Sequence, residues 1–339
     1  METQTNHDKF LQIDNTASAN QPMVSIVTPF YNTSMFLAEC IESVLRQTYQ
    51  NWEYILVNNC STDGSLEIAQ EYARQDRRIR IFSNKDFLGQ VDNYNHALTY
   101  ISPDSKYCKM VEADNWIFPH CLTEMVEVAE KHPSVGIVGS YYLFGDKVAG
   151  DGLAYPSTRI MGKTACLTHL TKSIPLFGAP TNLLLRSEIV REHTPFYSLT
   201  SLHEDTDICY AILQKWEFGF VHQVLTFLRI NEGSISSGLA DVDSYSLTKL
   251  VLFHKYGRWL LPDDSEYQRQ HRRLKKRYYE DLVELLMTRR RREVWKLHIR
   301  TLQKLNSELS ISSLLLAVVW KLGDLLFNPK KTIGNLVRH

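Results

Sequence analysis

The sequence VSIVTPFYN, at residues 24–32, is the stretch that decides the predicted fold of this 339-residue chain. Its first five residues are mostly apolar and β-branched, which is typical of a buried strand. Pro29 ends the run, because proline cannot donate a hydrogen bond to a neighbouring strand. Apolar residues then recur at helical spacing over residues 37–45. The segment therefore predicts a buried strand followed by an amphipathic helix.

The same alternation of strand and helix patterns continues to about residue 138. Further strands are predicted at residues 54–57, 79–82, 107–111 and 135–138, and helices around residues 68–72, 89–101 and 119–129. Repeated units of this kind predict an α/β domain with a mainly parallel sheet and helices on both faces. Ligands bind at the carboxyl ends of such strands, so the loops after Thr28, Val57 and Val111 are candidate sites.

The second half of the chain is less regular. Residues 141–178 show no assignable pattern, whereas strands are predicted at 181–185 and 218–228, with a helix starting near Glu204. Beyond Leu247 the pattern becomes helical and basic. The predicted organisation is a disordered lead-in at 1–22, an α/β domain at 23–240 and a basic amphipathic helical region at 241–339.

Composition and charge limit the classes of protein to which the chain can belong. With 44% hydrophobic and 22% charged residues, the chain has an ordinary globular composition, which argues against general disorder. The net charge of zero hides a split, because residues 269–339 carry about +11 and residues 1–268 about −11. A basic tail is attracted to anionic surfaces, and two solvated helix faces are the alternative. Nucleic-acid binding is disfavoured, because aromatic residues are not interleaved with the basic run at 289–292.

The cysteines and the apolar segments point to a cytoplasmic protein. The six cysteines are scattered without a C-x-x-C pair, which favours reduced thiols over a disulfide framework. The polar residues 1–22 do not resemble a signal peptide. No segment reaches the roughly 18 uninterrupted apolar residues of a spanning helix, since Lys321 and Asp324 interrupt residues 311–327.

Two loops at predicted strand ends suit a nucleotide. In residues 28–32, an aromatic side chain can stack on a nucleobase, although Phe30 and Tyr31 could instead cap the core. In residues 58–63, polar side chains precede a helix N-terminus, which suits a nucleotide, although an Asx-type turn with a helix cap has the same pattern.

A third loop places two carboxylates after the fourth predicted strand. Glu112 and Asp114 are two residues apart, so on an extended segment their side chains point the same way. Converging carboxylates favour a divalent cation that also carries phosphate oxygens, because hard cations prefer oxygen ligands. A solvated acidic turn is the alternative.

Together, four motifs in this order resemble the family 2 glycosyltransferases. They are VSIVTPFYN at 24–32, IESVLRQTY at 41–49, STDGS at 61–65 and EADN at 112–115. The resemblance covers roughly residues 22–235 and is specific for the family, not for a substrate. It implies a GT-A fold, a nucleotide-diphosphate sugar as donor and Mg²⁺ or Mn²⁺ as cofactor.

The resemblance also implies residue roles. Tyr31 falls where the family packs against the base, and Asn58 and Asn59 fall on its paired Asp, which hydrogen-bonds the uracil. Glu112 and Asp114 fall on its D-x-D motif, in which the first carboxylate faces the ribose and the last binds the metal. The predicted donor-binding residues are Thr28, Pro29, Phe30, Tyr31, Asn58, Asn59, Asn93, Glu112, Ala113 and Asp114, with Asp114 as the metal ligand.

The family's catalytic base lies in an acidic pair at the start of a later helix, and HEDTD at 203–207 fits that place. Asp205 fits the base, with Glu204 beside it as the other predicted catalytic residue. A carboxylate at a helix N-terminus stays ionised near neutral pH and can accept the proton of an acceptor hydroxyl. Without the upstream motifs, a helix cap would be the simpler role for Asp205.

The chain departs from the family at informative positions. Asn58 and Asn59 replace charged residues with amides, which still accept hydrogen bonds, so uracil or thymine remains the predicted base. Asn231 stands where the family often has histidine. The chain has no Q-x-x-R-W, the family's signature of processive synthases, which argues for transfer of a single sugar.

We therefore expect an inverting transferase that uses a UDP- or dTDP-sugar and a glycan or lipid-linked acceptor in bacterial cell-envelope polysaccharide synthesis. Residues 269–339 are predicted to make peripheral contact with the inner face of the cytoplasmic membrane, or else to pack on the body or on a second subunit. Two alternatives remain. A nucleotidyltransferase would need a glycine-rich loop that residues 28–32 lack, and a non-catalytic relative would only bind a glycan or a partner enzyme.

Overall fold

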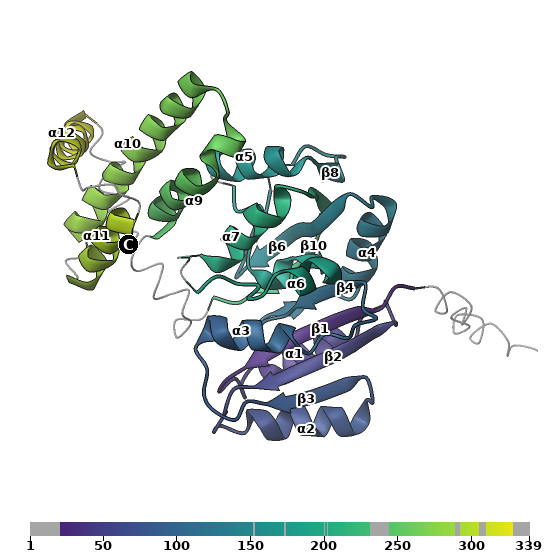
Figure 1. The fold of residues 1–339 in the computed structure, drawn as a ribbon. Helices are drawn as coiled ribbons and strands as arrows, with labels where there is room; N and C mark the ends of the chain where they lie inside the picture. The colour runs from purple at the N-terminus through teal and green to yellow at the C-terminus, as the bar shows by residue number, and fades with distance from the viewer. Residues whose placement is uncertain are drawn as a thin grey trace, which may run out of the picture. The chain divides into compact units, whose positions relative to one another are not determined.

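A computed structural model describes residues 21–151, 153–172, 174–199, 201, 203–230, 244–288, 292–304 and 310–327 (Figure 1). The predicted disordered lead-in at residues 1–22 lies almost wholly outside these residues. The chain divides into two compact units, Met1–Arg229 and Ile230–His339, which are described separately below. The predicted domain boundary at residue 240 also lies outside the described residues.

Within the described residues, the first unit is built on one mixed sheet of ten strands. The strand order is β3-β2-β1-β4-β9-β6-β10-β5, with β7 paired to β6 and β8 paired to β10. The bounds are β1 (Val24–Phe30), β2 (Trp52–Asn58), β3 (Ile79–Ser83), β4 (Tyr107–Met110), β5 (Trp116–Ile117), β6 (Val135–Phe144), β7 (Lys147–Ala149), β8 (Arg159–Ile160), β9 (Leu184–Arg186) and β10 (Glu217–Leu228).

The sheet is mainly parallel at the end that holds the predicted site. β3, β2, β1 and β4 are parallel neighbours, and β6 and β10 form a second parallel pair. β9 runs antiparallel between β4 and β6 and joins the two parallel groups. The carboxyl ends of β1, β2 and β4 therefore open on one edge, as the sequence predicted.

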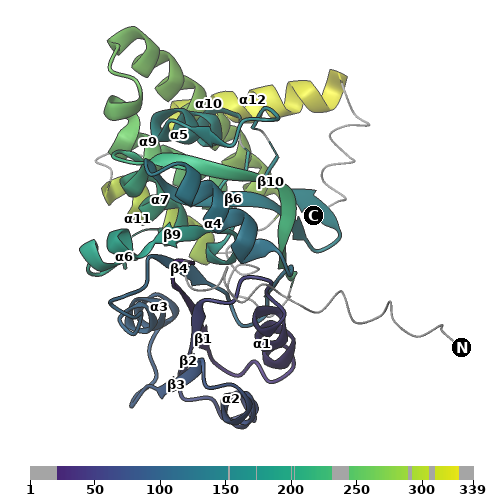
Figure 2. The ribbon, with the colours of Figure 1, turned by 90° about the vertical axis from the view of Figure 1, so that its right-hand side faces the viewer.

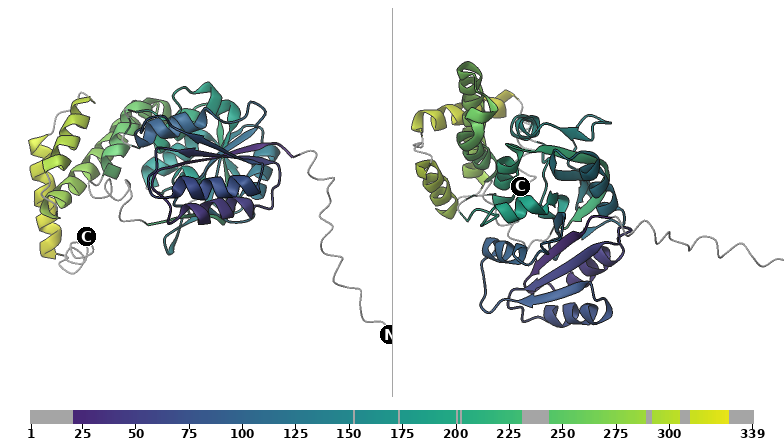
Figure 3. Two further views of the ribbon diagram at one scale, coloured as in Figure 1. Left: turned by 90° about the horizontal axis from the view of Figure 1, so that it is seen from below. Right: turned by 45° about the vertical axis from the view of Figure 1, so that its right-hand side comes forward.

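Helices cover both faces of this sheet. α3 lies on one side of β1–β3, and α1 and α2 lie on the other (Figure 2; Figure 3). Because both faces are covered, β1 is buried at all seven positions. The helices of the first unit are α1 (Leu37–Leu45), α2 (Ser65–Gln75), α3 (Gln90–Leu98), α4 (Cys121–Lys131), α5 (Gly162–Lys172), α6 (Ser187–Glu192) and α7 (Glu204–Leu213), with a 3₁₀ turn η2 (Pro180–Asn182).

The strand predicted at 181–185 is partly wrong, because residues 181 and 182 belong to η2 and β9 begins only at Leu184. Polar contacts explain the difference. The Thr181 hydroxyl accepts a hydrogen bond from the Glu112 backbone N–H at 3.0 Å, and Lys109 Nζ donates to the Thr181 carbonyl at 2.8 Å. These contacts occupy groups near the start of the predicted strand and favour the turn.

Two other predicted segments change in extent. The helix predicted at 89–101 ends at Leu98, and the strand predicted at 135–138 continues as β6 to Phe144. Residues 141–178, which showed no assignable pattern, contain the end of β6 together with β7, β8 and α5. Two-residue and three-residue strands are too short to give a periodic signal.

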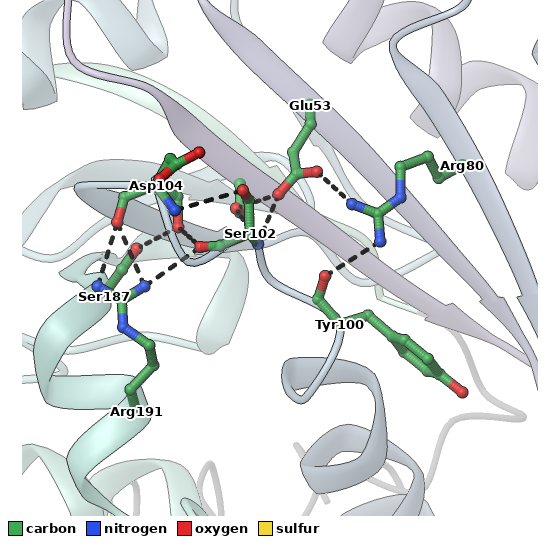
Figure 4. A network of polar contacts seen from close by, with 9 residues as sticks. Glu53, Arg80, Tyr100, Ser102, Asp104, Ser187 and Arg191 are labelled. Carbon is green, nitrogen blue, oxygen red and sulfur yellow. Dashed lines mark hydrogen bonds and ion pairs between the residues drawn. The ribbon is translucent and has the colours of Figure 1, made fainter.

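A polar network fixes the amino-terminal edge of the sheet, opposite the predicted site (Figure 4). Glu53 on β2 accepts hydrogen bonds from Ser25 at 2.6 Å, from the Ser102 backbone N–H at 2.8 Å and from Arg80 at 2.6 Å. Arg191 on α6 donates to the Ser102 carbonyl at 3.3 Å. These bonds therefore connect the loop before β4 to β1, β2, β3 and α6. This edge of the sheet has a structural role.

The second unit is helical in the described residues, as predicted. It comprises α9 (Ser244–Leu260), α10 (Asp264–Thr288), α11 (Arg292–Lys304) and α12 (Ile311–Phe327). Leu274, Tyr278 and Leu282 form a buried stripe on α10. On α11, His298 is buried against Tyr278, whereas Ile299 is 41% exposed. No described helix is long and apolar enough to cross a membrane.

Candidate functional site

The three predicted loops meet at the carboxyl edge of the sheet because their strands are neighbours. Phe30 at the end of β1 pairs with Asn58 at the end of β2, and the Phe30 carbonyl accepts the Asn59 backbone N–H at 2.9 Å. On the other side of β1, the Val27 carbonyl accepts the Val111 N–H at 2.9 Å. Loops that are about 80 residues apart in sequence therefore adjoin in space.

Both carboxylate oxygens of Glu112 accept hydrogen bonds at this edge. Its Oε1 accepts a hydrogen bond from the Tyr94 hydroxyl at 3.0 Å. Its Oε2 accepts bonds from Asn115 Nδ2 at 3.1 Å and from the Thr181 hydroxyl at 3.2 Å. These donors come from α3, the loop after β4 and η2, so Glu112 joins three segments. The ribose contact that the resemblance implies for Glu112 stays a prediction.

Three carboxylates converge on this edge. Burial and the charges of Asp114 and Asp205 raise the pKa of Glu112 to about 7, with the Tyr94 hydrogen bond opposing the rise. Burial also raises the pKa of Asp114, which the Arg229 guanidinium partly offsets. Glu112 is therefore within electrostatic range of both the predicted metal ligand and the predicted base, although Asp114 and Asp205 are 91 positions apart in sequence.

Arg229 fixes the loop that carries Asp114. Its Nε donates to the Asp114 carbonyl at 3.0 Å, and its backbone N–H donates to Asn115 Oδ1 at 2.9 Å. The guanidinium also pairs with Glu39 on α1. Arg229 was not among the predicted site residues. Asn231, two positions further along, lies outside the described residues.

Asp205 is the second residue of α7, at the helix N-terminus as predicted. Burial raises its pKa, while the Thr206 backbone N–H donates to it at 2.7 Å and lowers the pKa. Burial likewise raises the pKa of Glu204. Asp207, by contrast, is buried and accepts a hydrogen bond from the Ser201 hydroxyl at 2.6 Å. Of these three acids, Asp205 is the one whose charge acts on Glu112.

The residues present fit a divalent cation bound together with the donor. Among the described residues, no group of three or more His, Cys, Asp or Glu could hold a metal ion. Mg²⁺ and similar ions commonly use one or two carboxylates and take their other ligands from substrate phosphates and water. Converging carboxylates with raised pKa values also favour a cation, because a nearby positive charge removes their mutual repulsion.

The first loop divides into buried residues and one exposed aromatic. Thr28 is buried and its hydroxyl donates to the Val111 carbonyl at 2.6 Å, and Phe30 belongs to the core. Pro29 and Ala113 are buried as well. Tyr31 is 46% exposed, and its ring meets the ring of Phe87 edge-on at 4.8 Å. The stacking role of Tyr31 stays a prediction, and Phe87, its aromatic neighbour, was not among the predicted residues.

Asn59 holds the loop that carries Phe87. Its Oδ1 accepts hydrogen bonds from the Leu88 N–H at 2.9 Å and from Asn84 Nδ2 at 2.8 Å, and its Nδ2 donates to the Leu88 carbonyl at 2.8 Å. An aspartate could not make the last of these bonds, because a carboxylate has no donor. This gives a structural reason for the amide at a position where the family has Asp.

Three consecutive residues of α3 organise the loops around the site. Asn93 accepts a hydrogen bond from Asn84 Nδ2 at 2.8 Å, and Tyr94 bonds Glu112 as described above. Asn95 bonds both the backbone N–H and the carbonyl of Tyr197, at 2.7 and 2.9 Å. Only Asn93 was predicted as a site residue. Tyr94 and Asn95 had no signal in the sequence beyond their place on a polar helix.

Comparison with solved structures identifies the class of protein. S. aureus TarS 1–349 in complex with UDP-GlcNAc is similar at a TM-score of 0.61, with 15% identity over 84% of this chain and 80% of that one. The mannosyltransferase PcManGT from Pyrobaculum calidifontis, in complex with GDP-Man and Mn²⁺, is similar at 0.54, with 13% identity over 94% and 85%. At these identities the likeness concerns the fold, which is the GT-A type predicted from sequence.

Sequence comparison gives the family. Residues 25–194 match Glycosyl transferase family 2. The putative glycosyltransferase EpsE of Bacillus subtilis (strain 168) is 36% identical over 253 residues, covering 73% of this chain and 86% of that protein. Two further relatives match over 54% and 47% of their own length. The chain belongs to glycosyltransferase family 2 and is a glycosyltransferase, which excludes the nucleotidyltransferase alternative.

Proposed function

We propose that this enzyme transfers one sugar from a nucleotide-diphosphate sugar to an acceptor hydroxyl, with inversion at the anomeric carbon. The observation that carries the proposal is that the charges of Asp114 and Asp205 both act on Glu112, which follows β4 at the carboxyl edge of the sheet. In an α/β sheet this edge is where ligands bind. Inversion and single-sugar transfer follow from the family resemblance and from the missing processive signature.

The donor nucleotide lies with its base at Tyr31 and Phe87. Both side chains are exposed at the strand ends, so a planar base can pack against them without moving the core. UDP- and dTDP-sugars are the proposed donors, because uracil and thymine present similar hydrogen-bonding edges. Asn59, whose amide is bonded to Leu88, supports this base site through the loop that carries Phe87.

Asp114 is the proposed ligand of Mg²⁺ or Mn²⁺. A cation held by Asp114 would neutralise negative charge on the diphosphate of the donor. Arg229 keeps the Asp114 loop in place through its bond to the Asp114 carbonyl. Glu112, which receives three hydrogen bonds from protein donors, orients the same loop from the side of α3 and η2.

Asp205 is the proposed general base. Its raised pKa makes it a better proton acceptor than an exposed aspartate. The acceptor oxygen attacks the anomeric carbon, its proton passes to Asp205, and the bond to the departing diphosphate breaks. A single in-line displacement of this kind inverts the anomeric centre.

The acceptor is proposed to be a hydroxyl of a glycan or of a lipid-linked sugar in cell-envelope polysaccharide synthesis. The support is the family resemblance and the basic helical unit, which suits contact with an anionic surface. A cytoplasmic location with peripheral contact at the inner face of the membrane is part of the same proposal.

A donor-hydrolysis screen tests the proposed reaction. Purified protein is incubated with UDP-, dTDP- and GDP-sugars in the presence of Mn²⁺ or EDTA, and released nucleotide is measured. We expect slow release from one donor, lost with EDTA and in Asp114→Ala. Release that is unaffected by EDTA and by Asp114→Ala would contradict the assignment of Asp114.

A non-catalytic relative is the second candidate, and the Asn58-Asn59 departure is the observation that favours it. Calorimetry with UDP, dTDP and GDP separates the two. Nucleotide binding without turnover in any combination of donor and simple glycan acceptor would favour the binding protein. Turnover that disappears in Asp205→Asn would exclude it.

A further inference from the structure

Helix α12 turns its apolar side toward solvent. Six large apolar side chains on it are between 48% and 71% exposed, namely Ile311, Leu315, Leu316, Val319, Trp320 and Leu322. No other helix in the described part of the chain concentrates exposed apolar residues in this way. Contiguous apolar surface of this kind marks an interaction site more often than a chance exposure.

The exposed residues form one continuous face. Residues 311, 315, 319 and 322 follow each other at steps of four, four and three, and residues 316 and 320 form the adjacent row. On the opposite side, Ala317 is 4% exposed and Lys321 is half-buried. A surface helix whose outer face contacts only solvent would show the reverse pattern, with its charged residue on that outer face.

Contacts with α10 fix this orientation. Lys321 forms an ion pair with Glu284, in which each side chain is about one quarter exposed. At the start of α12, the backbone N–H of Ser310 donates to the Tyr279 hydroxyl at 2.7 Å. The two helices lie side by side within the second unit (Figure 1). The apolar face is therefore held outward by polar contacts on its other side.

Basic side chains border the apolar face. A groove between α10 and α12 is lined by Arg273, Lys276 and Arg277 on one helix and by Trp320 and Lys321 on the other, with Glu280 and Asp281 also at its wall. The Lys276 ammonium lies 4.9 Å from the centre of the Trp320 ring. Tryptophan and basic residues at the rim of an apolar surface are the combination found at membrane–water interfaces.

We propose that α12 lies flat on an anionic lipid bilayer, with its apolar face at the acyl boundary and the basic residues of α10 against lipid phosphates. The charge of the region, about +11 over residues 269–339, complements such a surface. An interfacial position also agrees with the finding that no described helix could span a membrane. The inferred lipid contact does not depend on the proposed function. Only the purpose of that contact, which is to bring the active site to a lipid-linked acceptor, rests on it.

Vesicle sedimentation with the full-length protein tests this surface. The probes are vesicles of phosphatidylcholine alone and of phosphatidylcholine mixed with phosphatidylglycerol. We expect binding to the anionic vesicles, weakened on the order of tenfold in Leu315→Glu and about fivefold in Arg273→Glu, and decreasing with added salt. Val148→Glu is the matched control, because Val148 is 60% exposed in the first unit and should leave vesicle binding unchanged.

Three results would overturn the proposal. One is equal vesicle binding by wild type and Leu315→Glu. Another is binding that is lost equally in Val148→Glu. The third is a dimer in light scattering that Leu315→Glu dissociates while no form of the protein binds vesicles, because the face would then belong to a second copy.

Donor hydrolysis in solution separates this inference from the proposed function. Leu315→Glu should hydrolyse the soluble donor at the wild-type rate while losing vesicle binding, which supports a surface distinct from the active site. Vesicle binding by a wild-type protein that hydrolyses no donor would support the lipid surface and count against the proposed reaction.

Discussion

The Tyr94 hydroxyl lies 3.0 Å from Oε1 of Glu112, and this hydrogen bond joins α3 to the acidic loop after β4. The residues on either side of Tyr94 bond two other loops, through Asn84 and Tyr197. Successive residues on a helix point about 100° apart, so three neighbours can reach three segments. α3 therefore acts as the common support of the candidate site.

Tyr94→Phe should impair transfer without unfolding the protein. A hydrogen bond to a charged group contributes about 1.5–3 kcal/mol, so its loss should lower kcat/KM by about tenfold or more. Steady-state transfer kinetics and thermal unfolding are the measurements. Tyr100→Phe is the control, because it removes a hydroxyl that contacts His96 at the far end of α3. Similar kinetics for the two variants would mean that Asn115 and Thr181 position Glu112 without help.

Asp205→Asn should abolish transfer and leave donor binding intact. The amide keeps the shape of the side chain but cannot accept the acceptor's proton, and general-base catalysis contributes about 10²- to 10⁴-fold. Transfer rates are compared with calorimetric binding of the donor. Asp207→Asn is the matched control, since Asp207 bonds Ser201 and has no proposed role in the chemistry. Near-full activity in Asp205→Asn, with loss in Glu204→Gln, would move the base to Glu204.

The pH dependence of kcat/KM should report the raised pKa of Asp205. Burial disfavours the carboxylate, so its pKa lies above the ordinary value of about 3.9. The base must be ionised, so activity falls as the pH decreases through this raised pKa. A pH profile of Glu112→Gln removes from the comparison the carboxyl whose pKa is raised to about 7. An acidic limb at or below the ordinary aspartate range would contradict the assignment.

Asn59→Asp should weaken nucleotide binding, although it restores the residue that the family has. The carboxylate would lose the donor to the Leu88 carbonyl and place an oxygen against it, which should loosen the loop that carries Phe87. We expect UDP to bind about tenfold more weakly by calorimetry, because an unmade buried hydrogen bond costs about 1–3 kcal/mol. Asn58→Asp is the control, because the bond that its Oδ1 accepts from the Ser61 N–H is kept by a carboxylate. Tighter UDP binding in Asn59→Asp would show that position 59 contacts the base directly.

Phe87→Ala should weaken binding of UDP and not of pyrophosphate with Mn²⁺. Stacking on an aromatic side chain contributes about 1–3 kcal/mol per base, which corresponds to roughly 5- to 150-fold in affinity. Phe144→Ala, which removes another half-exposed phenylalanine, should leave both affinities unchanged. An equal effect of Phe87→Ala on pyrophosphate would place its role in the phosphate region or in loop stability.

The sequence by itself determined the α/β class, the order of the first strands and the edge at which ligands would bind. These follow from local information, because burial imposes its own periodicity on strands such as β1 and on helices such as α1. It also predicted that Glu112 and Asp114 lie close together, although the extended loop assumed in that prediction is in fact a turn, in which the Asn115 N–H donates to the Glu112 carbonyl at 2.9 Å. The family of the chain was correctly identified from the same motifs.

Only the tertiary structure decided what each side chain contacts. Thr28, Pro29 and Phe30 are buried, Asn59 bonds the Leu88 backbone, and Arg229 reaches the Asp114 carbonyl across 115 positions. Asn59, which follows β2, can hold the loop that carries Phe87, which follows β3, only because β2 and β3 pair in parallel. Periodicity in the sequence indicates the spacing of buried positions along a strand or helix. The hydrogen-bond partner of a polar group depends instead on which distant segments packing brings beside it.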